Sequence, residues 1–418
     1  MRIFVTFSCL TLLVVPSGWA EQPCQRSNSQ TVLNQVKTIK AQLLAFKLQG
    51  EMDPEVPAPL QAQIRSFKES LAALAKTALQ CAPEDANPKV IETTLIKLLD
   101  ANKPVVVEEN DSRKPPQLDH IYGDGIDVKV TAPENYPNIR LIKISFGIAC
   151  SEDALLLAYE LHGSLWQQVL RWQSGNYDSI KDAFGDFFEY QVVPQKDPGN
   201  WLVAVAHGNP WCSSNMSGFD LDLIQPMQGP APQQILFHKN AIYTRASYTH
   251  VMKSKPDGFE LRLEAYSMDI GIIFRPVIYR YRVSGNQVVR IQPIAMNGRD
   301  FVDEWLQSEW SESKNWSATS EITELEAAYK KIRDLRDRDV SAKQWPDFTY
   351  GPVRGCSDSP SHYQVELDEG WWVEEKKDWR PDAPTFFQIE EGKNSFTMLS
   401  ASGKPDPHCT GHDIMPKR

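Results

Sequence analysis

The chain has 418 residues, of which 41% are hydrophobic and 23% are charged, and its formal net charge is −10 at pH 7. This apolar content excludes a chain that is disordered throughout. The negative charge argues against nucleic acid or an anionic lipid surface as a partner, because both attract basic proteins. A chain of this length holds two or three domains of about 100–200 residues each.

The first 20 residues have the composition of a secretory signal peptide. Arg2 precedes an apolar run from Ile3 to Val15, and the small residues Gly18 and Ala20 stand just before the expected cleavage site. The apolar run is shorter than the roughly 20 residues of a membrane-spanning helix, and no membrane span is expected later in the chain. We therefore expect cleavage after Ala20 and an exported protein, either periplasmic or secreted.

Cleavage would remove Cys9 and leave an even number of cysteines. An even number in an exported protein indicates disulfide bonds, although parity alone does not determine which cysteines pair. The remaining cysteines fall as three successive pairs, one in each of three regions of different composition. This arrangement favours the disulfides Cys24–Cys81, Cys150–Cys212 and Cys356–Cys409.

The first region, residues 21–102, is predicted to be a helical domain. Apolar residues recur at helical spacing over 31–48 and again over 57–80, with turn residues between the two runs. An antiparallel hairpin of these helices would bring the two cysteines of the region together. A third helix is expected over 88–99 and would cover the open face of the hairpin.

Residues 103–117 are rich in proline and charge, which is the composition of a linker. Residues 118–300 contain short apolar or alternating runs that are separated by turn signals such as His162-Gly163-Ser164. Successive hairpins of this kind predict a mostly antiparallel β domain, either a sandwich or an open barrel. Two of its expected strands, 235–237 and 241–247, follow a proline-rich segment.

Residues 301–340 are expected to be a helical connector. Apolar residues recur along 321–338, with glutamates in the first turn and arginines in the last, as the helix dipole favours. Residues 341–418 return to a β pattern and form a domain small enough to need its predicted disulfide. The chain is therefore predicted to have an α+β fold: a helical hairpin or three-helix unit, an antiparallel β domain, one long amphipathic helix and a small disulfide-stapled β-rich unit.

The sequence contains no strong metal-binding or nucleophile motif. His408 and His412 are four residues apart, but Pro407 and Gly411 argue against the helix on which such a pair chelates a metal. A solvated tail is the favoured interpretation there, and neither a metal nor a cofactor is predicted. His207 lies closest in the sequence to a pair of serines, but no Gly-x-Ser-x-Gly turn accompanies it.

His207 could act as a base for Ser213 or Ser214, although a polar turn explains the serines equally well.

Asp220 and Asp222 stand two residues apart on an expected strand and so share one of its faces. Paired carboxylates hydrolyse glycosidic bonds when they face each other across a cleft at about 5–9 Å. Sequence spacing does not reveal such a cleft, and the shared face is equally compatible with a solvated one.

Tryptophans are the most distinctive feature of the C-terminal region. Trp371, Trp372 and Trp379 stand among charged residues. Neighbouring residues of an extended chain point to opposite faces, so Trp371 and Trp372 cannot both enter the same core. Exposed tryptophan marks surfaces that bind proteins or glycans, whereas burial against another domain would make the second indole a structural contact. We predict that Trp371, Trp372 or Trp379 forms an exposed binding surface.

The favoured function is that of a non-catalytic exported protein that binds another macromolecule, a protein or a glycan, or that supports the cell envelope. The alternative is a secreted or periplasmic hydrolase of glycans or peptides, whose catalytic carboxylates the sequence does not identify. A cleft with two facing carboxylates, or a carboxyl group whose pKa is raised by burial, would favour the hydrolase.

Overall fold

The computed structural model describes residues 26–46, 56–83, 85–100, 122–148, 151–175, 187–197, 199–209, 216–227, 233–244, 250–269, 274–337, 344–373 and 377–415. The predicted signal peptide, the linker 103–117 and the pair Cys150–Cys212 lie outside these residues, as does Cys24. Cys81 is disulfide-bonded.

Three helices form the N-terminal layer, as predicted: α1 (Arg26–Leu44), α2 (Ala58–Gln80) and α3 (Pro88–Leu99). Helix α3 begins where the sequence signals a start, because the Asn87 side chain accepts a hydrogen bond from the Lys89 backbone N–H and Pro88 follows it. The apolar faces of the helices pack together and onto the first β-sheet.

The first β-sheet is a four-stranded antiparallel meander whose strands follow chain order: β1 (Asp127–Thr131), β2 (Ile139–Ile148), β3 (Ser151–His162) and β4 (Leu165–Gln173). Both faces of this sheet are covered. Leu155 and Leu157 of β3 pack against the helices, whereas Leu156 and Ala158 face the next sheet. Burial on both faces explains why β3 reads as a continuous apolar run rather than an alternating one.

The second β-sheet has eight strands: β5 (Phe188–Pro194), β6 (Trp201–Gly208), β7 (Met216–Pro226), β8 (Gln233–Thr244), β9 (Val251–Lys255), β10 (Gly258–Tyr266), β11 (Phe274–Ser284) and β12 (Gln287–Arg290). The described register joins β8 to β10 only through Tyr243 and Ala265. The sheet folds at this point into two layers, β5–β8 and β9–β12, with side chains such as Phe219 and Leu261 between them. The folded sheet fits the predicted sandwich or open barrel.

One strand differs from the expected pattern. The segments 235–237 and 241–247 were expected as separate strands, but β8 runs without interruption from Gln233 to Thr244. Lys239 and Asn240 lie in register with Leu221 and Asp220 of β7, so the polar residues between the two apolar segments belong to the ladder. The sequence predicts two strands instead of one because much of β8 is exposed, so its residues do not alternate regularly between apolar and polar.

The C-terminal part combines helices with a third sheet. Helices α4 (Gly298–Gln307), α5 (Trp310–Ser313) and α6 (Ile322–Arg336) precede β13 (Gln344–Gly355), β14 (His362–Val373), β15 (Asp378–Pro381), β16 (Thr385–Gly392) and β17 (Ser395–Ser402). Phe301 and Trp305 of α4 pack with Val365 and Phe387 of the sheet. The predicted disulfide Cys356–Cys409 is confirmed, with an S–S length of 2.02 Å.

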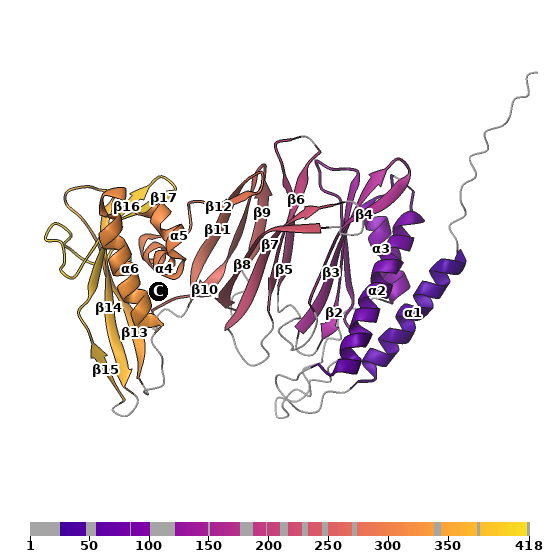
Figure 1. Cartoon of the computed structure of the whole chain (residues 1–418), viewed down its shortest axis with the longest axis horizontal. Helices are drawn as coiled ribbons and strands as arrows, with labels where there is room; N and C mark the ends of the chain where they lie inside the picture. The colour runs from indigo at the N-terminus through magenta and orange to yellow at the C-terminus, as the bar shows by residue number, and fades with distance from the viewer. Residues whose placement is uncertain are drawn as a thin grey trace, which may run out of the picture.

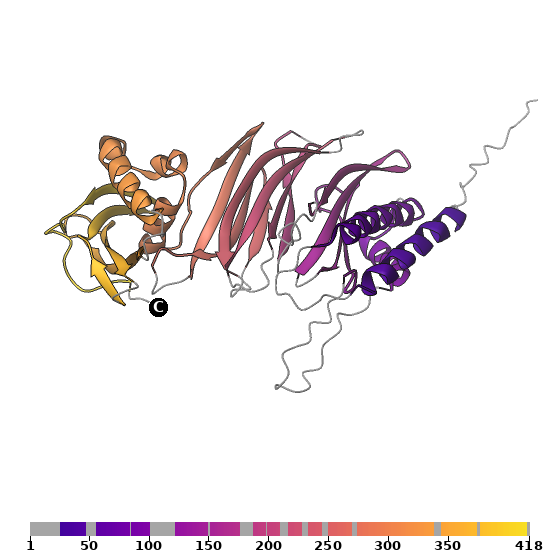
Figure 2. The same ribbon diagram turned by 60° about the horizontal axis from the view of Figure 1, so that its bottom comes forward.

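These units form a stack of layers along the long axis of the molecule, from the indigo helices at one end to the yellow sheet at the other (Figure 1). Helices α4–α6 lie between the second and third sheets in both views (Figure 2). The predicted α+β class with mostly antiparallel sheets is confirmed. Within the described residues, no helix combines the length and the apolar character that a membrane crossing requires.

Candidate functional site

The two adjacent tryptophans of β14 lie on opposite faces of the third sheet. The Trp371 side chain packs against the apolar core under α4–α6, together with Val365 and Leu367 of the same strand. Alternation along the strand therefore places Trp372 on the other face, where its side chain is partly exposed. The sequence argument for opposite faces is thus correct, and Trp371 is a core contact rather than part of a surface.

The strand register adds a third tryptophan to the outer face. Trp372 lies directly opposite Trp345 of β13 on one side and directly opposite Trp379 of β15 on the other. Direct cross-strand partners occupy the same face of a sheet. Trp345, Trp372 and Trp379 are therefore neighbouring positions on three adjacent strands, and we call this set the tryptophan row. The side chains of Trp345 and Trp379 lie outside the described part of the structure.

Acidic residues continue the same face of β14 beyond the row. Gly370 is next to Trp372 on this face, and Asp368 and Glu366 follow it, both partly exposed. Arg354 of β13 pairs with Glu366 at 3.1 Å. The face thus carries tryptophan positions at one end and carboxylates with one arginine at the other. Sequence reasoning had included Trp372 and Trp379 but not Trp345, which only strand pairing connects with them.

A second polar group lies between the first sheet and the β5–β8 layer, and we call it the histidine–aspartate cluster. It consists of His207 on β6, Asp220 and Asp222 on β7 and His238 on β8. Nδ1 of His238 lies 2.8 Å from Oδ1 of the buried Asp222, and its Nε2 lies 3.7 Å from Asp220. Nε2 of His207 lies 3.9 Å from the other oxygen of Asp220. The four side chains therefore alternate between imidazole and carboxylate across three strands.

Burial differs strongly between the two histidines. The His238 side chain is 52% exposed, whereas that of His207 is 13% exposed and stacks on Trp172 at 4.8 Å between ring centroids. Burial lowers the pKa of His207, although Asp220 and Asp222 act in the opposite direction. Asp220 and Asp222 do share a face, as their spacing predicted, but the face is a partly buried one.

The other candidates from the sequence are not brought together. Ser213 and Ser214 lie outside the described residues. His408 and His412 are exposed in the turns that follow β17. Among the described residues, no group of three or more His, Cys, Asp or Glu side chains is arranged to hold a metal ion.

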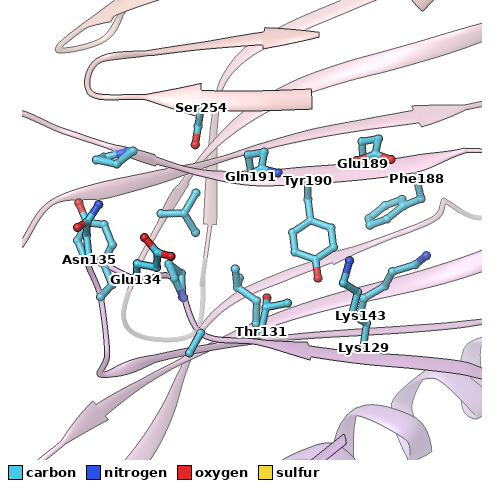
Figure 3. Close-up of a pocket in the computed structure, with 16 residues that line it drawn as sticks. Lys129, Thr131, Glu134, Asn135, Lys143, Phe188, Glu189, Tyr190, Gln191 and Ser254 are labelled. Atoms are coloured by element: carbon cyan, nitrogen blue, oxygen red, sulfur yellow. The ribbon is translucent and has the colours of Figure 1, made fainter. Parts of the chain in front are cut away.

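A cleft of about 410 Å³ opens between the edge strands β1 and β5 of the first two sheets, and we call it the inter-sheet cleft (Figure 3). Lys129 and Lys143 reach from β1 and β2 toward Phe188 and Tyr190 of β5, while Glu134 lies at the opposite end. Successive side chains of a strand point to opposite faces of the sheet. Val128 and Val130 of β1 therefore pack toward the helices, whereas Lys129 and Thr131 line the cleft. Sequence reasoning did not find this cleft.

Comparison with known proteins gives only weak similarities. No family model matches the chain, and no curated protein matches it. Among solved structures, an alpha-L-arabinanase from Penicillium chrysogenum in complex with arabinobiose shares 9% identity at a TM-score of 0.24, over 64% of this chain and 65% of that chain. A mutant alpha-L-arabinofuranosidase from Fusarium graminearum in complex with an iminosugar inhibitor shares 7% identity at a TM-score of 0.22, over 64% of this chain and 69% of that chain.

Both of these weakly similar chains are glycoside hydrolases. This chain spans about 65% of the length of the arabinanase. TM-scores of 0.24 and 0.22 are too low to assign a shared fold, so the similarities carry no argument about the activity of this protein.

Proposed function

We propose that this chain is a non-catalytic exported protein that binds a neutral glycan through the tryptophan row. The observation that carries the proposal is the backbone register, which makes Trp345 and Trp379 the direct cross-strand partners of the partly exposed Trp372. Part of the apolar surface of Trp372 remains in contact with water, and a ligand that covered this surface would gain the free energy of burying it. The disulfide Cys356–Cys409 supports an oxidising compartment for the protein.

The chemistry of the outer face favours a glycan over other polymers. Sugar rings combine apolar C–H faces, which suit the negative face of an indole, with hydroxyl groups that donate hydrogen bonds. Adjacent strands are about 4.7–4.9 Å apart, so three positions span about 10 Å and suit linked sugar rings. Asp368 and Glu366 provide acceptors for hydroxyl groups and repel anionic polymers, because they lie on the same face.

Affinity electrophoresis with soluble xylan, arabinan and β-glucan would test this proposal. We expect at least one neutral polysaccharide to retard the protein, and Trp372→Ala to weaken that binding by about tenfold or more, as for a central aromatic contact. Leu165→Ala is the matched control, because Leu165 is an apolar side chain that is 59% exposed on another sheet. Retardation that survives Trp345→Ala, Trp372→Ala and Trp379→Ala alike would overturn the proposal.

The histidine–aspartate cluster supports a second candidate, a hydrolase of glycans or peptides. Asp222 orients the half-exposed His238 imidazole, which is the arrangement that an acid–base catalyst requires. Asp220 lies close to both histidines and could stabilise the charged imidazole. This candidate is the weaker of the two, because the ion-pair partners of His238 among the described residues are carboxylates rather than a hydroxyl or thiol group that the imidazole could activate.

Product analysis separates the two candidates. The binding proposal expects that glycans retarded by the protein release no reducing ends during long incubation, and that casein remains intact. Hydrolysis that His238→Asn abolishes and that Trp372→Ala only weakens would favour the hydrolase instead. His162→Asn serves as the control, because His162 is also a partly exposed histidine beside a carboxylate, at 3.1 Å from Glu160.

A further inference from the structure

In the described part of the structure, the first sheet covers β5, β6 and β7 but not β8. The apolar residues that pack against the first sheet include Val192 of β5, Val205 of β6 and Ile224 of β7, whereas the described residues of β8 contribute none. Ile224 is completely buried, but its direct partner on β8, Ile235, is 53% exposed on the same face. The cover of this face therefore ends between β7 and β8.

The uncovered face of β8 carries apolar side chains on both sides of the histidine–aspartate cluster. Asn240 lies in register with Asp220 of β7 and is exposed, and Ile242 follows on the same face with an exposed fraction of 57%. We call Ile235, His238, Asn240 and Ile242 the uncovered strip. It has an isoleucine at each end and the half-exposed imidazole between them, so a strand that covered it would bury apolar surface.

The outer edge of the first sheet lies beside the uncovered strip. β4 is the last strand of this sheet, and no described strand pairs with its other side. Trp172 of β4 stacks on His207 of β6 at 4.8 Å between ring centroids. The Met227 N–H, just after β7, donates to the Val169 carbonyl of β4 at 3.0 Å. β4 therefore lies over β6 and β7, and one further strand, about 4.8 Å away, would lie over β8.

The edge of β4 has backbone groups that such a strand could use. The Ser174 N–H donates to the Ala154 carbonyl on the side of β3. Because the backbone groups of successive residues alternate between the two sides of a strand, Arg171 and Gln173 direct theirs to the outer edge. No described residue outside the first sheet forms a backbone hydrogen bond with these two residues. Backbone groups at the edge of a sheet are a template for another strand.

The charge beside the uncovered strip favours a basic partner. Among the described residues, the ion-pair partners of Asp220 and Asp222 are the two imidazoles of the cluster. The cluster is therefore neutral only when both imidazoles are protonated, and it is negative otherwise. Lys239 points to the opposite face of β8 and pairs with Glu312 at 3.6 Å. A basic side chain on an added strand would meet carboxylate charge here, whereas an acidic one would be repelled.

We propose that the edge of β4 binds an extended peptide segment of a protein partner as a fifth strand of the first sheet. A lysine or arginine of this segment lies over Asp220 and Asp222, and an apolar side chain lies over Ile242. Hydrogen bonds to the backbone of Arg171 and Gln173 align the segment, and the side chains that face β8 give specificity. This inference does not rest on the glycan-binding function, because β4 and β8 share no residue with the tryptophan row.

Isothermal titration calorimetry of the full chain with the peptide acetyl-Thr-Ile-Thr-Lys-Thr-Ile-Thr-amide tests the proposal. The isoleucines and the lysine of this peptide share one face when it is extended, as the uncovered strip requires. We expect it to bind at least tenfold more tightly than the same peptide with glutamate in place of lysine, because like charges across an interface are strongly disfavoured. Equal binding of the two peptides, or binding of neither, overturns the proposal.

N-methylated forms of the lysine peptide distinguish strand addition from contacts of side chains alone. Methylation of the threonine nitrogens blocks one edge of the extended peptide, and methylation of the isoleucine and lysine nitrogens blocks the other. Only one edge of a fifth strand faces β4. We therefore expect one set of methyl groups to abolish binding and the other to leave it largely intact. Retention of binding by both methylated peptides overturns the proposal.

Variants of the chain locate the binding. Gln173→Pro removes an N–H that faces the outer edge, where proline is tolerated, and should weaken peptide binding by about tenfold without lowering the unfolding temperature. Ile242→Thr should weaken it by about fivefold. Val289→Thr is the matched control, because Val289 is a β-branched residue that is 49% exposed on β12, and it should leave binding unchanged. Binding that is insensitive to both test substitutions, or a dimer of the chain that Gln173→Pro dissociates in place of peptide binding, overturns the proposal.

Discussion

Two joints of the molecule bury charged side chains: one lies between α2 and the first sheet, and the other lies between β11 and α4. They differ in the number of cationic groups that pair with the buried carboxylate. At the first joint, Lys68 of α2 pairs with Asp153 of β3 at 3.2 Å, and the side chains are 1% and 0% exposed. Burial raises the pKa of Asp153 to about 6, although Lys68 acts against this effect. Burial also lowers the pKa of Lys68.

At the second joint, Glu304 of α4 lies between two arginines. Its carboxylate oxygens are 2.5 Å from Arg275 and 2.6 Å from Arg290, and all three side chains are at most 4% exposed. Asp303 pairs with the same Arg275 at 2.8 Å. Burial alone raises the pKa of Glu304, but Arg290 and Arg275 outweigh it and hold this pKa at about 2.

The two joints show what keeps the pKa of a buried carboxylate low. One ammonium group does not compensate for the loss of hydration at Asp153, whereas two guanidinium groups with direct hydrogen bonds do so at Glu304. The raised pKa of Asp153 is the feature that would favour a hydrolase. It is instead a consequence of an enclosed structural contact, because Asp153 is completely buried between helix and sheet.

The largest effect is expected from Glu304→Gln. The substitution leaves Arg275 and Arg290 buried without their shared counter-charge, so the free energy of unfolding should fall by about 3–5 kcal/mol in urea denaturation. Glu309→Gln on the same side of the joint changes a carboxylate that is 74% exposed and should cost less than about 0.5 kcal/mol. Equal costs for the two variants would refute the comparison between a buried and an exposed carboxylate.

Lowering the pH should reduce the free energy of unfolding by a slightly smaller amount. A carboxyl group with a depressed pKa contributes stability that is present above its unfolded pKa and is lost as the pH falls toward its folded pKa. For Glu304 this window lies between its ordinary value of 4.5 and about 2, so about 3 kcal/mol should be lost across it. Denaturation at pH 5 and pH 2.5 measures this loss, and Glu304→Gln should show a shallower acid dependence than the native chain.

Lys68→Met should have an intermediate effect that depends on pH in the opposite sense. A carboxyl group with a raised pKa contributes stability below its unfolded pKa and loses it as the pH rises through the folded pKa, which is about 6 for Asp153. Without Lys68 we expect a loss of about 2–3 kcal/mol at pH 8 and a smaller loss at pH 5. The double variant Lys68→Met/Asp153→Leu should recover most of the stability, and a further loss would contradict this account.

The smallest effect is expected at the surface of the same joint. Glu69 of α2 accepts hydrogen bonds of 2.8 and 2.7 Å from Arg171 of β4, but its side chain is 66% exposed. Solvent and salt screen such a pair, so Glu69→Gln should lower the free energy of unfolding by less than about 1 kcal/mol. A cost comparable to that of Lys68→Met would show that exposure does not separate the two pairs.

The sequence by itself determined the features that depend on local periodicity. Apolar spacing placed α1–α3 and α6, and turn residues such as Gly163 marked hairpins, because helical and strand periods repeat within a few residues. The pairing of Cys356 with Cys409 followed from their position in one small region. The opposite orientations of Trp371 and Trp372 followed from alternation alone.

Only the tertiary structure decided which strands are neighbours, because register and sheet assignment are not local properties of the chain. Strand pairing brought Trp345 beside Trp372 across about thirty residues. It also joined Asp222 to His238 and divided the β region into two sheets, which opened the cleft that Lys143 and Tyr190 share. Each of these sites combines side chains from different strands, and the free energy that aligns those strands comes from burial of both sheet faces rather than from the sequence of any one strand.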